Sequence, residues 1–312
     1  MKTKNFEMTM SDGNKNFVYQ WIPDGKVESV VVISHGMAEH ALRYAEFAGF
    51  LCENNCAVIC EDHRGHGKTA WLESGKSEDW KKNLGCFCSD GFVRSSEDVF
   101  EEISYAKNEF PGVPVILCGH SYGSFLSQRV IELHGHSFDK AILLGTAGPR
   151  RFLMFFASIF GMAIKAVLGP DKKSKILNTL AFGSYNNRIK NKRTENDWIS
   201  SDPDAVDRYN ADELCGFQCS CNFMCNLFLG FRKIHKTSQM KKIPVELPVL
   251  LLAGKDDPVG DYGKTVEKLY REYLKYGMKK VEFKLYDNAR HELLNEFCRK
   301  DVMDKILKFI KS

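Results

Sequence analysis

The sequence lacks the features that mark secreted, repetitive and nucleic-acid-binding proteins. Its N-terminal stretch, MKTKNFEMTMSDGNK, contains no apolar run of the kind that a secretory signal peptide has. No internal repeat or low-complexity tract is visible, and a formal net charge of +4 is too small to indicate a nucleic-acid partner. We therefore expect a cytoplasmic globular protein, in which 312 residues form one large domain with an insertion or two ordinary domains.

Long hydrophobic runs are also scarce. The most apolar one, FLMFFASIFGMAIKAVLG at 152–169, barely reaches the length of a membrane span and is interrupted by Lys165. We therefore predict a buried or interfacial helix here.

Cysteine, in contrast, is frequent, but its pattern is not that of a disulfide framework. The count of eleven is odd, the chain is long and no secretory signal is visible, so we expect reduced thiols. Four of them, Cys215, Cys219, Cys221 and Cys225, lie close together without the C-x-x-C pair of a zinc knuckle. We predict a reduced helical packing surface, with a metal or redox role as the alternative.

Where regular patterns are present, short apolar strands alternate with helical spacing. Strands are predicted at 17–22, 29–34, 56–62, 113–119, 139–146, 247–254 and 279–287. Helices are predicted at 42–55, 91–110, 122–135, 261–276 and about 292–310. Uninterrupted apolar strands between helices are typical of a mostly parallel central sheet flanked by helices.

The regular alternation stops between residues 150 and 235, where the chain is helix-like, aromatic and rich in cysteine. We therefore predict an α/β fold in two parts, 1–149 and 237–312, with a helical cap inserted at 150–236.

The stretch VILCGHSYGSFL places Ser121 between Gly119 and Gly123, directly after a predicted strand and before a predicted helix. A G-x-S-x-G motif arises by chance in roughly one of ten such chains, so the context has to decide. A strand–turn–helix context is that of a nucleophile elbow, in which a tight turn raises the serine hydroxyl above the sheet. A loop serine in a glycine-rich turn is the alternative.

A serine hydroxyl needs a base, and in this kind of fold an acid and a histidine follow at the ends of later strands. LLLAGKDDPVG places Asp256 and Asp257 after one strand, and KLYDNARHELLNE places His291 after the last strand, at the start of the last helix. Pro258 disfavours helical geometry at the residue before it, which fits a strand-exit loop. We therefore predict Ser121, Asp257 and His291 as the catalytic residues.

The stretch VVISHGMAEH follows an early strand, where this fold places the second donor of an oxyanion hole. We predict that the backbone N–H groups of Met37 and Tyr122 stabilise the charge that develops on a substrate carbonyl oxygen. His35 in the same stretch is predicted to be structural.

EDHRGHGKT contains Asp62, His63 and His66, which resemble metal ligands. Gly65 and Gly67 fit a sharp turn after a strand, and no further partner is evident. We therefore predict turn architecture rather than a metal site.

Together these segments resemble the α/β-hydrolase superfamily, and more closely its monoglyceride lipase and lysophospholipase branch, often grouped as the serine aminopeptidase S33 family. The matching segments are SHGMAEH, EDHRGHGKT, CGHSYGS, GKDDPVG and ARHELLNE, and the cap resembles bacterial members, so the resemblance covers nearly the whole chain. Asp257 stands three residues after Gly254, as in the family's G-x-x-D pattern. Tyr122 departs from the methionine common in lipases of this branch, so the local pocket shape can differ.

The resemblance implies hydrolysis of a carboxylic ester, with a monoacylglycerol or a lysophospholipid as substrate, through an acyl-enzyme and without a cofactor or metal. It also implies that substrate choice comes from the cap. The apolar run at 152–169 is suited to lining an acyl tunnel or meeting a membrane or micelle, and the alternative is an ordinary buried helix. Two other functions stay open: an S33-type aminopeptidase, and a non-catalytic ligand-binding protein on the same fold.

Overall fold

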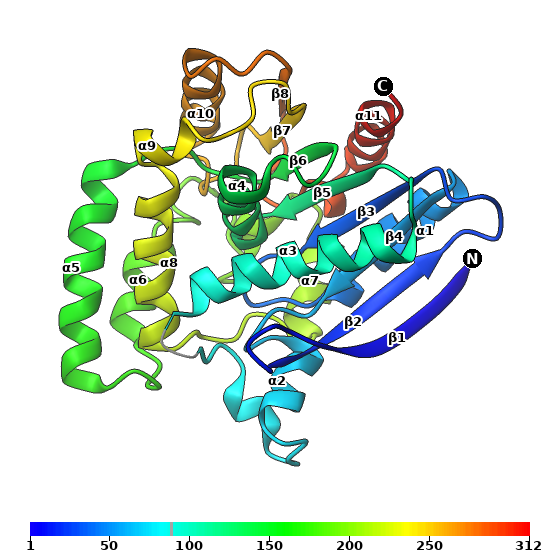
Figure 1. Ribbon diagram of the computed structural model, residues 1–312. Helices are drawn as coiled ribbons and strands as arrows, with labels where there is room; N and C mark the ends of the chain where they lie inside the picture. Colours follow the sequence, from blue (N-terminus) through cyan, green and yellow to red (C-terminus); the bar gives the residue numbers. More distant parts are fainter. Residues whose placement is uncertain (88–89) are drawn as a thin grey trace.

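The computed structural model describes residues 1–87 and 90–312. Its centre is an eight-stranded sheet with strand order β1-β2-β4-β3-β5-β6-β7-β8 (Figure 1). The pairs β1–β2 and β2–β4 are antiparallel, and every other neighbouring pair is parallel. The strands are β1 (Lys2–Thr9), β2 (Lys15–Ile22), β3 (Ser29–Ser34), β4 (Cys56–Glu61), β5 (Val115–His120), β6 (Lys140–Leu144), β7 (Val249–Gly254) and β8 (Val281–Tyr286). The predicted α/β-hydrolase fold, with a mostly parallel sheet, is confirmed.

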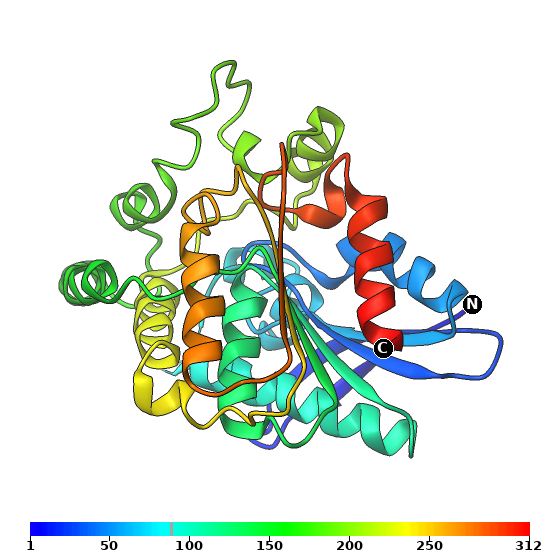
Figure 2. The ribbon, with the colours of Figure 1, turned by 90° about the horizontal axis from the view of Figure 1, so that it is seen from above.

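The central strands are buried along their whole length and mostly apolar, because both faces of the sheet are covered by helices (Figure 2). Successive side chains of β3 alternate between two cores: Val30 and Val32 contribute to one, and Val31 and Ile33 to the other. The first core is covered by α3 (Gly91–Glu109), α4 (Tyr122–His134) and α10 (Lys264–Lys275), and the second by α1 (Ala45–Glu53) and α11 (Arg299–Lys311).

The block between β6 and β7 is helical. It contains α5 (Arg151–Leu168), α6 (Lys175–Phe182), η3 (Asp197–Ile199), α7 (Pro203–Ala211), α8 (Cys221–Ile234) and α9 (Thr237–Met240). Helix α8 joins the core through buried side chains such as Phe223 and Phe231. Helix α5 packs on α8, where a Cβ on Gly161 would lie 3.3 Å from the Phe228 ring, so a small residue permits the close approach.

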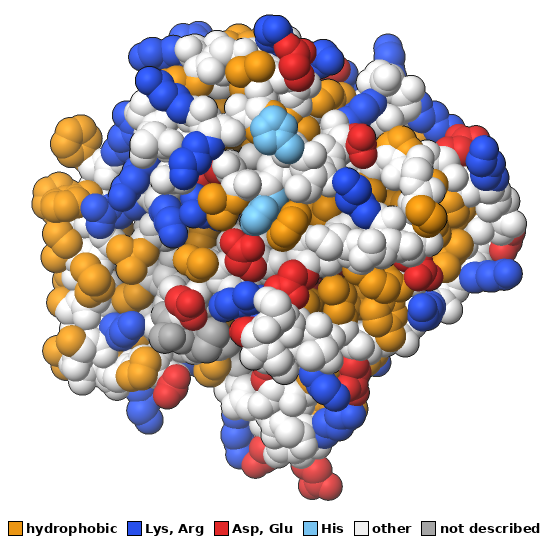
Figure 3. Space-filling model, in the orientation of Figure 1, with side chains coloured by type: hydrophobic (Ala, Val, Ile, Leu, Met, Phe, Trp, Pro, Cys, Tyr) orange, Lys and Arg blue, Asp and Glu red, His pale blue; other side chains and the backbone are white. Residues whose placement is uncertain are grey.

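The outer face of α5 is exposed and apolar, which forms the orange margin at the left of Figure 3. Phe152 is 85% exposed and Val167 is 83% exposed, although large apolar side chains are usually buried. Lys165 does not interrupt this face, because its ammonium group donates to Asn222 Oδ1 on α8 at 2.8 Å. By length and composition α5 could cross a membrane, and only 11% of it is buried, unlike the core helix of a globular protein, but a single helix of this kind is weak evidence for a span.

Two helices begin later than the sequence predicts. The last helix begins at Arg299 rather than near residue 292, because the preceding Glu292 and Glu296 turn inward to bind Arg43 and the backbone N–H of Arg290. Helix α10 begins at Lys264 rather than at residue 261. Residues 261–263 have positive φ angles, so they cannot continue a right-handed helix.

The ten cysteines within the described residues are free thiols, and the eleventh, Cys88, lies outside the described residues. Cys219, Cys221 and Cys225 are buried, and they contribute apolar packing at the start of α8 and along it.

Candidate active site

Ser121 lies in the turn between β5 and α4, with φ +51° and ψ −117°. Such a backbone is costly for a residue other than glycine and marks a constrained turn. The flanking glycines leave no room for side chains: a Cβ on Gly119 would lie 2.2 Å from Ser127 Oγ, and one on Gly123 would lie 2.0 Å from the Ser34 carbonyl oxygen. The two glycines therefore allow α4 to start directly against β3 with Ser121 at its N-terminus.

Asp257 and His291, which follow β7 and β8, lie together. His291 Nδ1 and Asp257 Oδ2 are 3.0 Å apart, and the other carboxylate oxygen of Asp257 accepts from the Val259 N–H at 2.8 Å. Both side chains are buried. Asp256 is exposed, and its backbone N–H donates to the Ala289 carbonyl oxygen. Of the two neighbouring aspartates, the structure therefore brings Asp257 to His291.

The His291 imidazole lies next to the residues around Ser121. The Ser121 N–H donates to the Leu144 carbonyl oxygen, and a Cβ on the following Gly145 would lie 3.1 Å from both Nδ1 and Cε1 of His291. The ring of His120, which precedes the serine, has its centroid 4.9 Å from that of His291. Among the described residues the Ser121 hydroxyl has no hydrogen-bond partner, and the contact between serine and histidine in such sites is often completed only when substrate binds.

The electrostatics of this pair favour the protonated imidazole. Burial by itself lowers the pKa of His291, but the charge of Asp257 and its hydrogen bond outweigh burial, so the net effect is a raised pKa. An imidazole with a raised pKa is a stronger base, which suits it to accept a proton from a hydroxyl group.

The backbone N–H groups of Met37 and Tyr122 make no hydrogen bond within residues 1–87 and 90–312. By contrast, the N–H groups of Gly36 and Ala38, on either side of Met37, are both bonded to side chains. Tyr122 is the first residue of α4, so the positive end of the helix dipole also lies at this point. Within the described residues, the N–H groups of Met37 and Tyr122 are therefore free to donate to another group.

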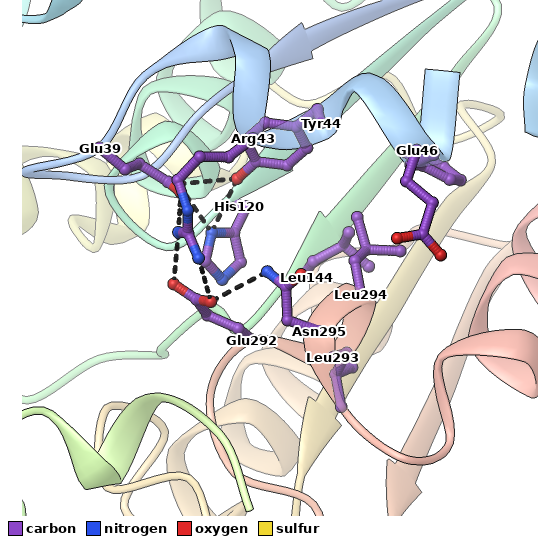
Figure 4. Close-up of a pocket in the computed structure, with 11 residues that line it drawn as sticks. Glu39, Arg43, Tyr44, Glu46, His120, Leu144, Glu292, Leu293, Leu294 and Asn295 are labelled. Atoms are coloured by element: carbon purple, nitrogen blue, oxygen red, sulfur yellow. Dashed lines mark hydrogen bonds and ion pairs between the residues drawn. The ribbon is translucent and has the colours of Figure 1, made fainter. Parts of the chain in front are cut away.

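Glu39 organises the loop that carries Met37. Its Oε1 accepts from the Gly36 N–H at 2.5 Å and from the Tyr44 hydroxyl at 2.7 Å, and lies 3.3 Å from His120 Nδ1 (Figure 4). Burial alone would raise the pKa of Glu39, but the positive Arg43 and the hydrogen bond with His120 hold it well below its usual range. The carboxylate is therefore charged and fixes the backbone just before Met37.

Arg43 links Glu39 to the residue after His291. Its guanidinium contacts Glu39 Oε2 at 2.5 Å and both carboxylate oxygens of Glu292 at 2.7 Å (Figure 4). All three side chains are mostly buried, so the ion pairs are little screened by water. Sequence reasoning missed this network, although the i, i+4 spacing of Glu39 and Arg43 is typical of an ion pair between these two residues.

The helical block between β6 and β7 contributes an aromatic side chain that sequence reasoning also missed. The Trp198 ring in η3 lies 5.1 Å from the His291 ring and 4.9 Å from the Tyr185 ring, between centroids. The Glu292 N–H donates to the Ile199 carbonyl oxygen at 2.7 Å, which ties η3 to the histidine loop. No spacing pattern in the sequence pairs Trp198 with His291, because they are far apart in the chain.

The histidine-rich turn is held by hydrogen bonds. His35 bonds through Nδ1 to the Gly36 carbonyl oxygen and accepts at Nε2 from the His63 N–H. His66 accepts from the Ala38 N–H, and the Asp62 carboxylate accepts from two backbone N–H groups. Burial lowers the pKa of each of the three imidazoles, which keeps them neutral and able to accept. These roles fit the predicted turn architecture.

Within the described residues, one group of His, Cys, Asp or Glu ligand atoms is close enough to share an ion: His40, Asp212 and Cys215, within 4.8 Å of one another. His40 Nε2 is already 2.8 Å from Asp212 Oδ2. Burial raises the pKa of the Cys215 thiol, although the nearby Arg43 opposes this. The arrangement therefore favours a hydrogen-bonded pair beside a neutral thiol.

The family model described as serine aminopeptidase, S33 matches residues 25–297. Human monoglyceride lipase is 27% identical over 291 residues, which cover 92% of this chain and 82% of the relative. A monoacylglycerol lipase of Mycolicibacterium smegmatis is 27% identical over 306 residues, which cover 96% of this chain and 94% of the relative.

A solved thermostable carboxyl esterase from Bacillus coagulans, in complex with glycerol, superposes with a TM-score of 0.90. It is 27% identical and covers 100% of this chain and 98% of its own. The family model covers most of the chain. The chain therefore belongs to the serine aminopeptidase S33 family of α/β-hydrolases, within which its relatives include monoglyceride lipases.

Proposed function

We propose that this chain hydrolyses the carboxylic ester of a monoacylglycerol or a lysophospholipid through an acyl-enzyme formed on Ser121. The observation that carries the proposal is the buried pair of Asp257 and His291, whose histidine lies beside the constrained Ser121 turn. Relatives that are lipases of glycerol monoesters, together with a similar carboxyl esterase, support a carboxylic ester hydrolase.

In the proposed reaction His291 takes the proton of the Ser121 hydroxyl as its oxygen attacks the ester carbonyl carbon. Asp257 holds the imidazole with Nε2 toward the serine and stabilises the imidazolium. The carbonyl oxygen becomes negative, and the N–H groups of Met37 and Tyr122 donate to it, each worth about 10²–10³ in rate. The imidazolium then gives its proton to the leaving alcohol, and a water activated by the same histidine hydrolyses the acyl-enzyme.

The substrate class rests on the relatives and on the surroundings of the site. The similar esterase binds glycerol, and the two relatives named above are lipases of monoacylglycerol. We assign the helical block 150–236 as the cap. Trp198 of this block stands next to His291, and Tyr185 stands next to Trp198, where apolar rings suit an acyl chain better than a peptide.

We also propose that the cap makes transient contact with a membrane or micelle. The contact surface, here called the apolar cap face, consists of Phe152, Phe156, Ile159, Phe160 and Val167 of α5 with Ile176 and Leu180 of α6. Exposed apolar patches of this kind mark interaction sites, and a lipid surface would deliver a water-insoluble substrate.

The test is labelling and hydrolysis with the wild-type chain and the Ser121→Ala variant. A fluorophosphonate probe should label the wild type and not the variant, and the variant should lose several orders of magnitude in kcat/KM. A panel of monoacylglycerols, lysophospholipids, short p-nitrophenyl esters and aminoacyl amides assigns the substrate. Faster cleavage of aminoacyl amides than of esters would favour an aminopeptidase, and absence of labelling would favour a binding protein.

A further inference from the structure

The part of the cap that carries α5 and α6 has an unbalanced charge. Residues 150–193 contain ten Lys and Arg residues but one acidic residue, Asp171. Because the net charge of the whole chain is +4, the remainder of the chain is net negative. In Figure 3, blue side chains gather next to the orange margin formed by α5. An apolar helix face flanked by Lys and Arg is typical of segments that lie on an anionic lipid surface.

A cavity of about 730 Å³ lies where α5 begins, beside the C-terminal end of α8 and α9. Its cationic lining comes from Arg150, Arg151, Arg232 and Lys236, and its apolar lining comes from Phe and Met side chains of α5 together with Phe231. None of the described lining residues is acidic. A cavity with cationic groups and apolar walls matches a molecule that has an anionic head and a hydrocarbon tail.

The start of α5 also lacks the negative charge that a helix N-terminus favours. Arg150 occupies the N-cap without a side-chain cap bond, and the first turn contains no acidic residue. The positive end of the helix dipole therefore coincides with the side chains of Arg150 and Arg151. An anion bound in the cavity would relieve this accumulation of positive charge.

Of the cationic side chains of the lining, Arg151 contacts Glu272 Oε2 at 3.4 Å, whereas Arg232 is held in place without being neutralised. Arg232 donates to Ser158 Oγ at 2.7 Å and lies 5.0 Å from the centre of the Phe155 ring, and within the described residues it has no carboxylate partner. His235 is 2% exposed, and neither of its ring nitrogens makes a hydrogen bond of ordinary geometry, although the backbone of Phe231 is near. The N–H groups of Arg232 and His235 are therefore available to donate to a ligand.

We propose that this cavity binds the phosphate of an anionic phospholipid while the apolar cap face lies among the acyl chains, so that the chain docks preferentially on anionic membranes. This inference rests on the lipid contact proposed above and adds the head-group chemistry. At about 1.5 Å per residue, α5 is about 27 Å long. It lies along the surface of the protein. The cavity is at one end of α5, and Lys172, Lys173 and Lys175 follow the other end.

The experiment measures flotation with vesicles of phosphatidylcholine, alone or mixed with phosphatidylglycerol. The Ser121→Ala variant serves as the parent, so that binding is measured without hydrolysis. Arg232→Gln with Lys236→Gln removes two cavity charges. Lys308→Gln with Lys311→Gln removes two charges from α11, which lies on the far side of the molecule from α5 in both ribbon views. Thermal unfolding shows that each variant is folded.

The parent is expected to bind the mixed vesicles more tightly, and the cavity variant should bind them roughly 10- to 30-fold more weakly, since each basic residue near an anionic surface contributes about fivefold. The α11 variant should bind like the parent. Equal binding to both vesicle types, or unchanged binding by the folded cavity variant, overturns the inference. Arg151→Gln gives a second route if the double variant does not fold.

Two further measurements separate the remaining explanations. Calorimetry with inorganic phosphate tests for a free anion: phosphate binding that the cavity variant loses, together with mixed-vesicle binding that it keeps, would assign the cavity to a free anion and make the lipid assignment wrong. Hydrolysis of a short soluble ester by the wild type is measured in parallel. Ester hydrolysis without an anionic preference contradicts only this inference, whereas anionic binding without ester hydrolysis contradicts only the proposed reaction.

Discussion

Replacing Asp257 with asparagine should remove most of the activity, and the structure explains why either orientation of the amide is unfavourable. One carboxylate oxygen faces His291 Nδ1 and the other accepts from the Val259 N–H. Asparagine has one oxygen and one NH₂ group, so a donor will face a donor at one of these two positions. If the NH₂ group faces His291, the imidazole must carry its proton on Nε2 and cannot accept one from Ser121.

The expected loss is about 10⁴ in kcat, which corresponds to about 5.5 kcal/mol of transition-state stabilisation. If the amide instead turns its oxygen to the histidine, the partly buried Val259 N–H faces the amide NH₂ group and loses its acceptor, at a cost of about 1 kcal/mol in folding free energy. The pH profile should also change. The wild-type kcat/KM should rise with pH as His291 loses its proton, with a midpoint above the ordinary histidine value because its pKa is raised. Removing the Asp257 charge should lower that midpoint.

Asp256→Asn is the matched control, because it makes the same chemical change one residue earlier on an exposed side chain. It should cost less than about tenfold in kcat and change the unfolding free energy by about 0.5 kcal/mol or less. The assay is steady-state hydrolysis of a short p-nitrophenyl ester, with unfolding followed by circular dichroism. A larger loss at Asp256 than at Asp257 would refute the assignment, and near-wild-type rates in both variants would place the acid elsewhere.

Arg43→Met should destabilise the fold by about 3–5 kcal/mol, because it leaves the buried carboxylates of Glu39 and Glu292 unpaired. Adding Glu39→Gln and Glu292→Gln should recover part of the lost thermal stability, and a triple variant less stable than Arg43→Met would contradict this account. Gly123→Ala should abolish activity or folding, because its Cβ would meet the Ser34 carbonyl oxygen at 2.0 Å, and wild-type hydrolysis by this variant would show that the turn is looser than described. Chelators should leave kcat/KM unchanged, and strong inhibition that zinc reverses would revive a metal role for the histidine-rich turn.

Local sequence determined most of the order of elements and the Ser121 turn, but the largely exposed strand β1 and the short helix α2 (Gly67–Glu73) were not predicted. The apolar runs of β3, β4, β5 and β7 predict buried strands, because strands covered on both faces have near-continuous apolar runs. The two glycines around Ser121 predict the tight turn, since the steric reason lies within a few residues of chain. The start of the last helix was predicted too early, because the partners of Glu292 and Glu296 are distant in sequence.

Tertiary structure alone decided which distant groups meet. Arg43 joins Glu292 across 249 positions, and Trp198 reaches His291 from the cap, contacts that no periodicity or spacing encodes. The sequence also could not predict that α5 lies at the surface, because a run of apolar residues fits a buried helix and an exposed one equally well. Only the packing of one side of α5 on α8 fixes which apolar side chains are left to face outward.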